Sequence, residues 1–132
     1  GWGGRGGGWA MGPRIGRGGG AGGIAGLGGA GVEAMAGRLA PAGGSALAVA
    51  ANITEAPDRE RLVETTIRAF GRIDVLVNNA GIMQRMALQD VTYEVWHRTM
   101  QVNLDAAFFC SQAVLSVMRE RGKGRIVNIS SM

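Results

Sequence analysis

The pattern of apolar positions predicts alternating strands and helices from about residue 46 onward. Residues 46–51 form a short apolar run, which predicts a buried strand. Pro57 then begins an amphipathic helix, and Gly71 ends it. The apolar face of this helix recurs at helical spacing and consists of Leu62, Val63, Ile67 and Phe70.

The same alternation continues along the rest of the sequence. Residues 73–77 predict a second strand, and residues 78–81 (Asn-Asn-Ala-Gly) predict a turn out of it. Thr92 is the expected N-cap of a long helix that extends to about Arg121, where glycines break it. Residues 125–129 predict a further strand. Strands that alternate with helices through short connections run parallel and are joined by right-handed crossovers, so the sequence predicts an α/β fold.

The first 31 residues have a different composition. They hold 17 of the 24 glycines and show neither the strand period nor the helix period. Glycine loses the most backbone entropy on ordering and offers no side chain to bury. We therefore expect residues 1–31 to be disordered or to come from a mistranslated start, and residues 32–132 to form the folded domain. Within that domain, residues 32–39 predict a weak helix.

Composition and charge narrow the possible classes of protein. A chain of 132 residues can form one small domain, and without a run of eighteen apolar residues it predicts no membrane-spanning helix. The net charge of +4 is too small to indicate a nucleic-acid partner by itself. Cys110, the only cysteine, lies in an apolar run, so we expect a buried, inert thiol in a reducing cytoplasm. His97 is the only histidine and has no second ligand at helical spacing, so no metal site is expected.

Four short motifs carry a resemblance to a known family. Residues 51–54 read Ala-Asn-Ile-Thr, residues 77–81 Val-Asn-Asn-Ala-Gly, residues 101–109 Gln-Val-Asn-Leu-Asp-Ala-Ala-Phe-Phe and residues 124–131 Gly-Arg-Ile-Val-Asn-Ile-Ser-Ser. In this order and at these separations they resemble the motifs of the short-chain dehydrogenase/reductase family. The resemblance covers about residues 32–132 and is greatest to 3-oxoacyl-carrier-protein reductases and to classical alcohol dehydrogenases of that family.

The resemblance implies a fold and a cofactor. The fold would be a partial Rossmann-like, doubly wound parallel sheet that contains the third to fifth strands and their helices. The cofactor would be NAD or NADP. Asn52 would accept a hydrogen bond from the adenine amino group, Ile53 would make a backbone contact, and Asn79, Ala80 and Gly81 would line the adenosine side. From the residues alone, Asn52 could instead be an asparagine at the start of a helix, and residues 79–81 could be an ordinary strand-to-loop turn.

The resemblance also implies two catalytic residues. Asn103 would hold a water of a proton relay, and Ser131 would donate a hydrogen bond to the carbonyl oxygen of an alcohol or ketone substrate. Alternatively, Asn103 could be a structural asparagine whose polar groups are hydrogen-bonded within the fold, and Ser131 could be a polar residue at a strand end. The family's Tyr-x-x-x-Lys pair is not in the sequence, since Tyr93 is the only tyrosine and position 97 is histidine. We expect the pair beyond Met132 in the parent protein, and therefore expect this chain to be an inactive fragment.

The amino-terminal strands expected for such a fold are not recognisable. Residues 19–25 are the nearest candidate for a phosphate-binding turn, but Ala25 replaces the last glycine and no strand-like run precedes them. Without two further strands, residues 46–51 would have no neighbour beside residues 73–77. We therefore expect the chain alone to be marginally stable or prone to aggregation. The residue that separates NAD from NADP lies on the second strand, so the preference stays open.

Two other functions remain open. Residues 3–7 and 16–19 resemble Arg-Gly-rich segments that bind single-stranded nucleic acid, although they contain few arginines. A non-catalytic nucleotide-binding or oligomerisation remnant is the other alternative. In relatives the long helix packs between subunits, so the resemblance implies a homodimer or homotetramer through residues 92–121, with no membrane partner.

Overall fold

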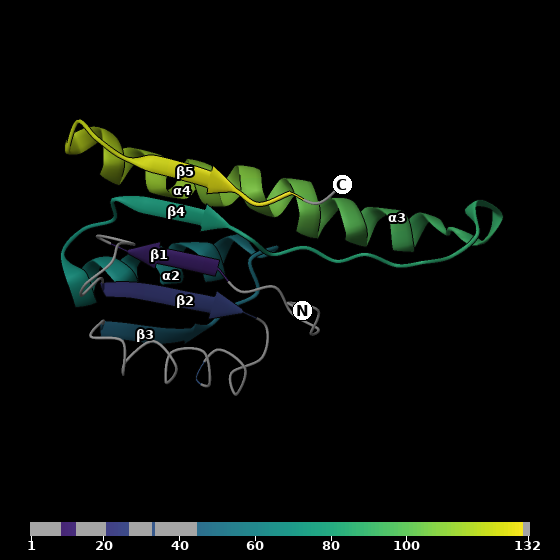
Figure 1. Cartoon of the computed structure of the whole chain (residues 1–132), viewed down its shortest axis with the longest axis horizontal. Helices are drawn as coiled ribbons and strands as arrows, with labels where there is room; N and C mark the ends of the chain where they lie inside the picture. Colours follow the sequence, from purple (N-terminus) through teal and green to yellow (C-terminus); the bar gives the residue numbers. More distant parts are fainter. Residues whose placement is uncertain (1–8, 13–20, 27–32, 34–44, 131–132) are drawn as a thin grey trace.

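The chain forms one five-stranded sheet with two long helices packed against it (Figure 1). The computed structural model describes residues 9–12, 21–26, 33 and 45–130. The order of the strands across the sheet is β3-β2-β1-β4-β5. The strands are β1 (Trp9–Gly12), β2 (Ala21–Gly26), β3 (Ser45–Ala50), β4 (Val75–Asn78) and β5 (Arg125–Asn128).

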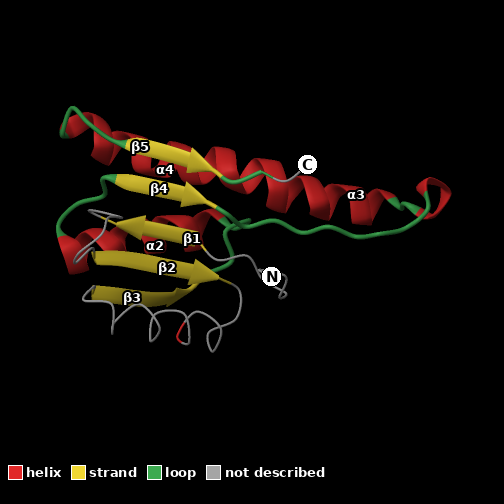
Figure 2. Cartoon of the chain, in the orientation of Figure 1, coloured by secondary structure: helices red, strands yellow, loops and turns green. Residues whose placement is uncertain are grey.

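Four of the five strands run in the same direction. β2 pairs with β3 in parallel, and β4 pairs with β5 in parallel. β1 is antiparallel to both of its neighbours, β2 and β4, so these two neighbours are parallel to each other. The carboxyl ends of β2, β3, β4 and β5 therefore lie at one edge of the sheet, as the arrowheads show (Figure 2). The predicted α/β fold with parallel strands is confirmed, and β1 is its exception.

The amino-terminal segment contains two strands that the sequence did not predict. The expectation of no regular structure in residues 1–31 is wrong for β1 and β2. These strands are held by backbone pairing with β3 and β4, which side-chain periodicity cannot reveal in a glycine-rich stretch. Most of the candidate phosphate turn, from residue 21 onward, is part of β2. Of the weak helix predicted over residues 32–39, all but the exposed, helical Glu33 lies outside the described residues.

Helix α2 (Ala56–Phe70) follows β3, as predicted. Pro57 occupies its first turn, where the missing N–H costs no hydrogen bond. Gly71 ends the helix with φ at 73°, a left-handed conformation that favours glycine, and its N–H donates to the carbonyl of Ile67 at 2.7 Å. Leu62 and Thr66 are the fully buried residues on its sheet-facing side.

The long predicted helix is divided into three parts. Helix α3 (Tyr93–Met100) begins at Thr92, whose hydroxyl accepts a hydrogen bond from the N–H of Val95 at 3.3 Å, so the predicted N-cap is confirmed. A π-helical turn, η3 (Gln101–Asp105), leads into helix α4 (Ala106–Glu120). The sequence did not predict this interruption. A short 3₁₀ turn, η2 (Leu88–Asp90), precedes α3.

Helices α2 and α4 pack side by side on the same face of the sheet (Figure 1). Their buried residues meet the inward side chains of β3 and β4 and of the turn after β3, and together these form the core. None of the helices in the described part of the chain is long and apolar enough to span a membrane. The core consists of Val49, Ala51, Ile53, Leu62, Ile73, Leu76, Ala106, Cys110, Val114 and Met118.

Candidate functional site

The predicted site residues follow the carboxyl ends of the parallel strands. Asn52 and Ile53 follow β3, and residues 79–81 follow β4. The ends of β4 and β5 are direct neighbours, because Asn78 is paired with Asn128 across the two strands. The end of β3 is separated from β4 by β2 and β1, a span of about 14 Å at the usual strand spacing. Open α/β sheets bind ligands along this edge.

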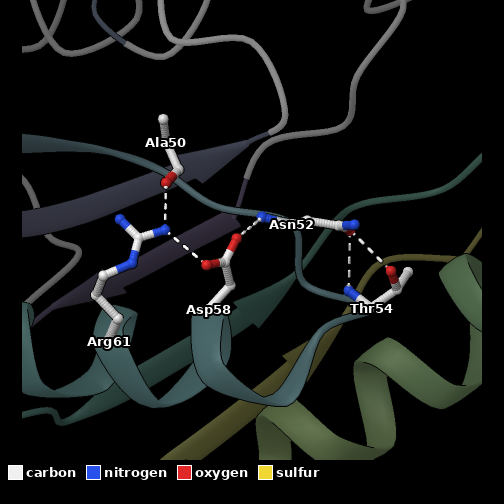
Figure 3. A network of polar contacts seen from close by, with 5 residues as sticks. All are labelled: Ala50, Asn52, Thr54, Asp58 and Arg61. Atoms are coloured by element: carbon white, nitrogen blue, oxygen red, sulfur yellow. Dashed lines mark hydrogen bonds and ion pairs between the residues drawn. The ribbon is translucent and has the colours of Figure 1, made fainter.

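The turn after β3 is fixed by a network of polar contacts (Figure 3). Asp58 in the first turn of α2 accepts the backbone N–H of Asn52 at 2.6 Å and a hydrogen bond from Arg61 at 2.8 Å. Arg61 also donates to the carbonyl of Ala50 at 2.9 Å. The side-chain oxygen of Asn52 accepts from the N–H of Thr54 at 3.2 Å and from its hydroxyl at 2.8 Å.

This network stabilises the charged form of Asp58. The hydrogen bond from Arg61, followed by the one from the Asn52 N–H, lowers the pKa of the Asp58 carboxyl below its ordinary value. The carboxylate therefore ties the start of α2 to the end of β3 at neutral pH. Ile53 lies within this turn with its side chain in the core, and its carbonyl accepts from Arg59 at 2.7 Å.

Asn78, the last residue of β4, is a buried polar residue that the sequence analysis did not select. Its side-chain NH₂ donates to Asn128 at 2.7 Å, to the Ser111 hydroxyl at 3.1 Å and to the carbonyl of Ala107 at 3.3 Å. Its side-chain oxygen has no hydrogen-bond partner among the described residues. The alternation of inward and outward side chains along β4 could have identified Asn78 as buried, since it places Asn78 on the same inward face as Leu76.

Residues 79–81 form the turn that leaves β4. Asn79 is half-buried, and Ala80 packs against the core. Gly81 is exposed, and a Cβ atom added there would lie 3.6 Å from the side-chain oxygen of Asn103, an ordinary contact. The fold itself therefore leaves room for a small side chain at Gly81.

Asn103 reaches this turn from the π-helical segment. Its side-chain oxygen accepts from the N–H of Ile82 at 2.8 Å, and its NH₂ donates to the carbonyl of the same residue at 2.9 Å. The structure thus joins Asn103 to the segment that directly follows Gly81, although 21 residues separate the pair in sequence. Single π-turns within helices occur frequently at functional sites.

The paired hydrogen bonds predict a local effect of replacing Asn103. In Asn103→Ala, both backbone groups of Ile82 lose their partner, at about 1 kcal/mol for each bond. We expect hydrogen exchange at the Ile82 amide to become roughly five- to tenfold faster, measured by NMR. The matched control is Asp105→Ala, an exposed residue of the same π-turn, which should leave this rate unchanged. Equal exchange rates in Asn103→Ala and the wild-type chain would contradict the pairing.

The sequence analysis considered three further residues, Ser131, Cys110 and His97. Ser131, the other predicted catalytic residue, lies outside the described residues. Cys110 is buried, and burial raises the pKa of its thiol to about 12, so it is not a nucleophile at neutral pH. His97 is exposed and packs edge-on against Tyr93, with ring centres 4.5 Å apart.

Fold and site together define a Rossmann-like α/β protein. Its parallel strands end at one edge, and polar residues follow β3, β4 and β5 along that edge. The chain belongs to the short-chain dehydrogenase family, because the family model described as short chain dehydrogenase matches residues 3–132. Members of this family are oxidoreductases that use NAD or NADP.

Comparison with individual proteins agrees with this assignment. The chain is 40% identical over 100 residues to a 3-oxoacyl-[acyl-carrier-protein] reductase of Synechocystis sp., a match that covers 76% of this chain and 40% of that protein. It is 40% identical over 104 residues to an L-rhamnose 1-dehydrogenase (NAD(P)(+)) of Azotobacter vinelandii, covering 78% and 41%. The chain therefore spans about two fifths of the length of these relatives.

A solved structure shows the same fold. A 7α-hydroxysteroid dehydrogenase complexed with NADH and 7-oxo glycochenodeoxycholic acid superimposes with a TM-score of 0.78 at 27% sequence identity. The superposition covers 83% of this chain and 43% of the dehydrogenase. Over the matched part, the arrangement of strands and helices described above is thus similar to that of this dehydrogenase.

Proposed function

We propose that this chain is the cofactor-binding part of an oxidoreductase that transfers hydride between NAD(P)(H) and an alcohol or ketone. The observation that carries the proposal is the pairing of Asn103 with Ile82. It brings the proposed catalytic asparagine to the turn that would line the cofactor. The nicotinamide ring would supply the hydride chemistry when the cofactor is bound.

The proposed cofactor-binding residues fit a dinucleotide along the sheet edge. Asn52 and Ile53 would contact the adenine ring at the end of β3, and Asn79, Ala80 and Gly81 would line the adenosine side. Gly81 fits this role because its exposed backbone carries no side chain that would hold a ligand away. Residues after parallel strands in such a sheet face the crevice where ligands bind.

The proposed catalytic residues act on the substrate oxygen. Asn103 would hold a water of the proton relay with the second hydrogen of its NH₂ group or with its backbone carbonyl. Ser131 would donate a hydrogen bond to the substrate carbonyl and so stabilise its negative charge. Proton transfer needs a further acid, and the sequence has no lysine four residues after a tyrosine. We therefore propose that this chain binds the cofactor but does not turn over substrate by itself.

Cofactor binding and turnover can be tested separately. We expect the purified chain to bind NADH, detected by calorimetry or by NADH fluorescence, and to reduce no ketone above background. Gly81→Ala should weaken binding about tenfold or more by blocking approach to the backbone, with little change in the unfolding midpoint. Gln112→Ala, an exposed change on α4, is the control. Absence of NADH binding in the wild-type chain would contradict the proposed function.

A second role is association with another copy through residues 92–121. Large apolar side chains are exposed along α3, η3 and α4, a pattern that monomers rarely carry on one helix face. A homodimer or homotetramer of the parent protein in the cytoplasm would cover these side chains. If the chain does not bind nucleotide, its remaining role would be that of an oligomerisation remnant. The Arg-Gly-rich segments considered for nucleic acid lie outside the described residues. The exposed residues include Trp96, Leu104, Phe108 and Leu115.

A further inference from the structure

The side chain of Arg59 joins the turn after β3 to helix α4. Its Nη1 atom donates a hydrogen bond to the carbonyl of Ile53 at 2.7 Å. Its guanidinium carbon lies 5.1 Å from the centre of the Phe109 ring on α4, within the range of a cation–π interaction. One side chain of α2 therefore contacts both the turn proposed to meet the adenine ring and the helix that follows the π-turn of Asn103.

These two contacts hold the guanidinium of Arg59, which forms no ion pair in the described part of the chain. Glu55 and Glu60 are close to it in sequence, yet neither carboxylate pairs with it. A guanidinium suits the observed arrangement, because its edge donates N–H groups while its planar face lies over an aromatic ring. A lysine ammonium has no such plane. The link between Ile53 and Phe109 therefore depends on arginine at this position.

A groove separates side chains of α2 and α4 next to this link. It has a volume of about 450 Å³ and is lined by the amino-terminal parts of both helices, with Arg59 on one wall and Phe109 on the other. Because the groove is open, direct packing contributes less to the spacing of the two helices here than it does in a filled core. The contact between Arg59 and Phe109 bridges the two walls.

The bridge connects the two segments that would enclose the adenosine of the cofactor. At one end, Ile53 belongs to the turn after β3. At the other end, Phe109 lies on the helix that directly continues from η3, where Asn103 is paired with Ile82 just beyond Gly81. The Asp58 and Arg61 contacts cannot replace this bridge, because they tie the turn to α2 and β3 and include no residue of α4.

We infer that Arg59 is a positioning residue for cofactor binding. Through Ile53 and Phe109 it holds the turn after β3 at the distance from residues 79–81 that the adenosine of NAD(P) requires. Arg59 acts on these segments and does not itself contact the ligand. This inference rests on the proposed function, because it assumes that both segments bind the cofactor. It adds a residue of α2, outside all the motifs, to the residues that determine affinity.

The diagnostic variant is Arg59→Met, which removes both contacts and keeps an apolar stem. We expect the dissociation constants of NADH, by fluorescence, and of AMP, by NMR titration, to rise together by about three- to tenfold, because both ligands carry the adenosine. Titrations are performed where circular dichroism shows every variant to be folded, so that a loss of stability alone leaves the constants unchanged. Arg68→Met, the same change at an exposed position of α2, is the control for charge.

A double-mutant cycle tests the contact with the aromatic ring. Phe109→Leu keeps an apolar side chain on α4 and removes the cation–π interaction, so it should also weaken NADH and AMP, by about two- to fivefold. Combined with Arg59→Met, it should cause no further loss, because the interaction is already absent. Arg59→Lys keeps a cation and a donor, and should recover part of the affinity lost in Arg59→Met.

The outcomes separate the inference from the proposed function. NADH binding by the wild-type chain with equal constants in Arg59→Met and Arg68→Met would overturn the inference and leave the proposed function intact. A loss for NADH without a loss for AMP, or effects of Arg59→Met and Phe109→Leu that multiply, would also overturn it. If Arg59→Met does not fold, unchanged AMP binding in Phe109→Leu overturns it instead. Binding of neither ligand by the wild-type chain would overturn both statements.

Discussion

Asn78→Asp is expected to unfold the chain at pH 7, with a loss of about 3 kcal/mol or more in the free energy of unfolding. The NH₂ group of Asn78 donates to three acceptors on β5 and α4. A carboxylate there would replace the donor by an oxygen that faces the same acceptors, in a position where only 4% of the residue is exposed. A urea titration followed by far-UV circular dichroism measures the free energy of unfolding. If the wild-type chain unfolds at low urea concentration, an equal amount of the stabilising osmolyte trimethylamine N-oxide is added to every sample.

The matched control lies at the other end of one of these hydrogen bonds. Asn128→Asp keeps an acceptor for the NH₂ of Asn78, and residue 128 is exposed, so the new charge stays hydrated. We expect its free energy of unfolding to stay within about 1 kcal/mol of the wild-type value. Equal stability of Asn78→Asp and Asn128→Asp at pH 7 would show that Asn78 is not held as described.

The penalty at position 78 should depend on pH. In the Asn78→Asp variant, burial among acceptors raises the pKa of the introduced carboxyl in the folded chain above its unfolded value of about 3.9. Below that value the group is protonated in both states, so the charge penalty is absent. As the pH rises from about 4 toward the folded pKa, the penalty grows and then stays constant. The stability of Asn78→Asp relative to the wild-type chain should therefore recover between pH 7 and pH 4.

The sequence predicted those elements whose side chains carry a clear period or a clear terminus. Helix α2 begins and ends within one residue of the expected positions, because a proline and a following glycine restrict the backbone at its two ends. β3, β4 and β5 also lie where apolar runs predicted them, shifted by at most two residues. Local side-chain chemistry was sufficient for these elements.

The remaining elements depend on partners far away in the sequence. β1 and β2 are recognisable only through the backbone pairing that β4 and β3 offer. The π-turn at Gln101–Asp105 arises in a stretch of ordinary helix-forming pattern, where Asn103 pairs with Ile82 across the site. No period in the sequence contains that contact. The strand order is likewise a tertiary property, and the antiparallel direction of β1 could not be predicted.

The candidate site divides in the same way. The motifs led to Asn52, Gly81 and Asn103, and the structure places the first two directly after parallel strands, with Asn103 joined to the turn that follows Gly81. They did not show which atoms of Asn52 are occupied, since that depends on the hydrogen bonds of Thr54. The motifs also did not identify Asn78 as a site residue, because its hydrogen-bond partners lie on β5 and α4, far away in the sequence. The motifs therefore predicted the positions of these residues, and the structure shows which of their atoms are already hydrogen-bonded within the fold.

Leu62→Ala is expected to lower the free energy of unfolding by about 2–5 kcal/mol, the second large effect. Leu62 is fully buried on α2, within the same core as Val49, Ala51 and Ile53 at the end of β3. Truncation removes apolar contacts and leaves a cavity that surrounding residues fill only in part. The measurement is the same urea titration, and the control is Leu88→Ala, whose side chain is 88% exposed and should change stability by less than about 0.5 kcal/mol.

The core beneath the turn links this loss of stability to function. Ile53 contributes its side chain to the core around Leu62, and it belongs to the turn after β3 that is proposed to contact the cofactor. Conditions that leave Leu62→Ala folded should therefore still loosen the turn after β3 and weaken NADH binding, whereas Leu88→Ala should bind as the wild-type chain does. Unchanged binding in a folded Leu62→Ala chain would show that the Asp58 and Arg61 contacts alone hold the turn. We expect the packing of α2 against β3 to position this turn, because the hydrogen bonds around Asp58 are partly solvent-exposed and individually weak.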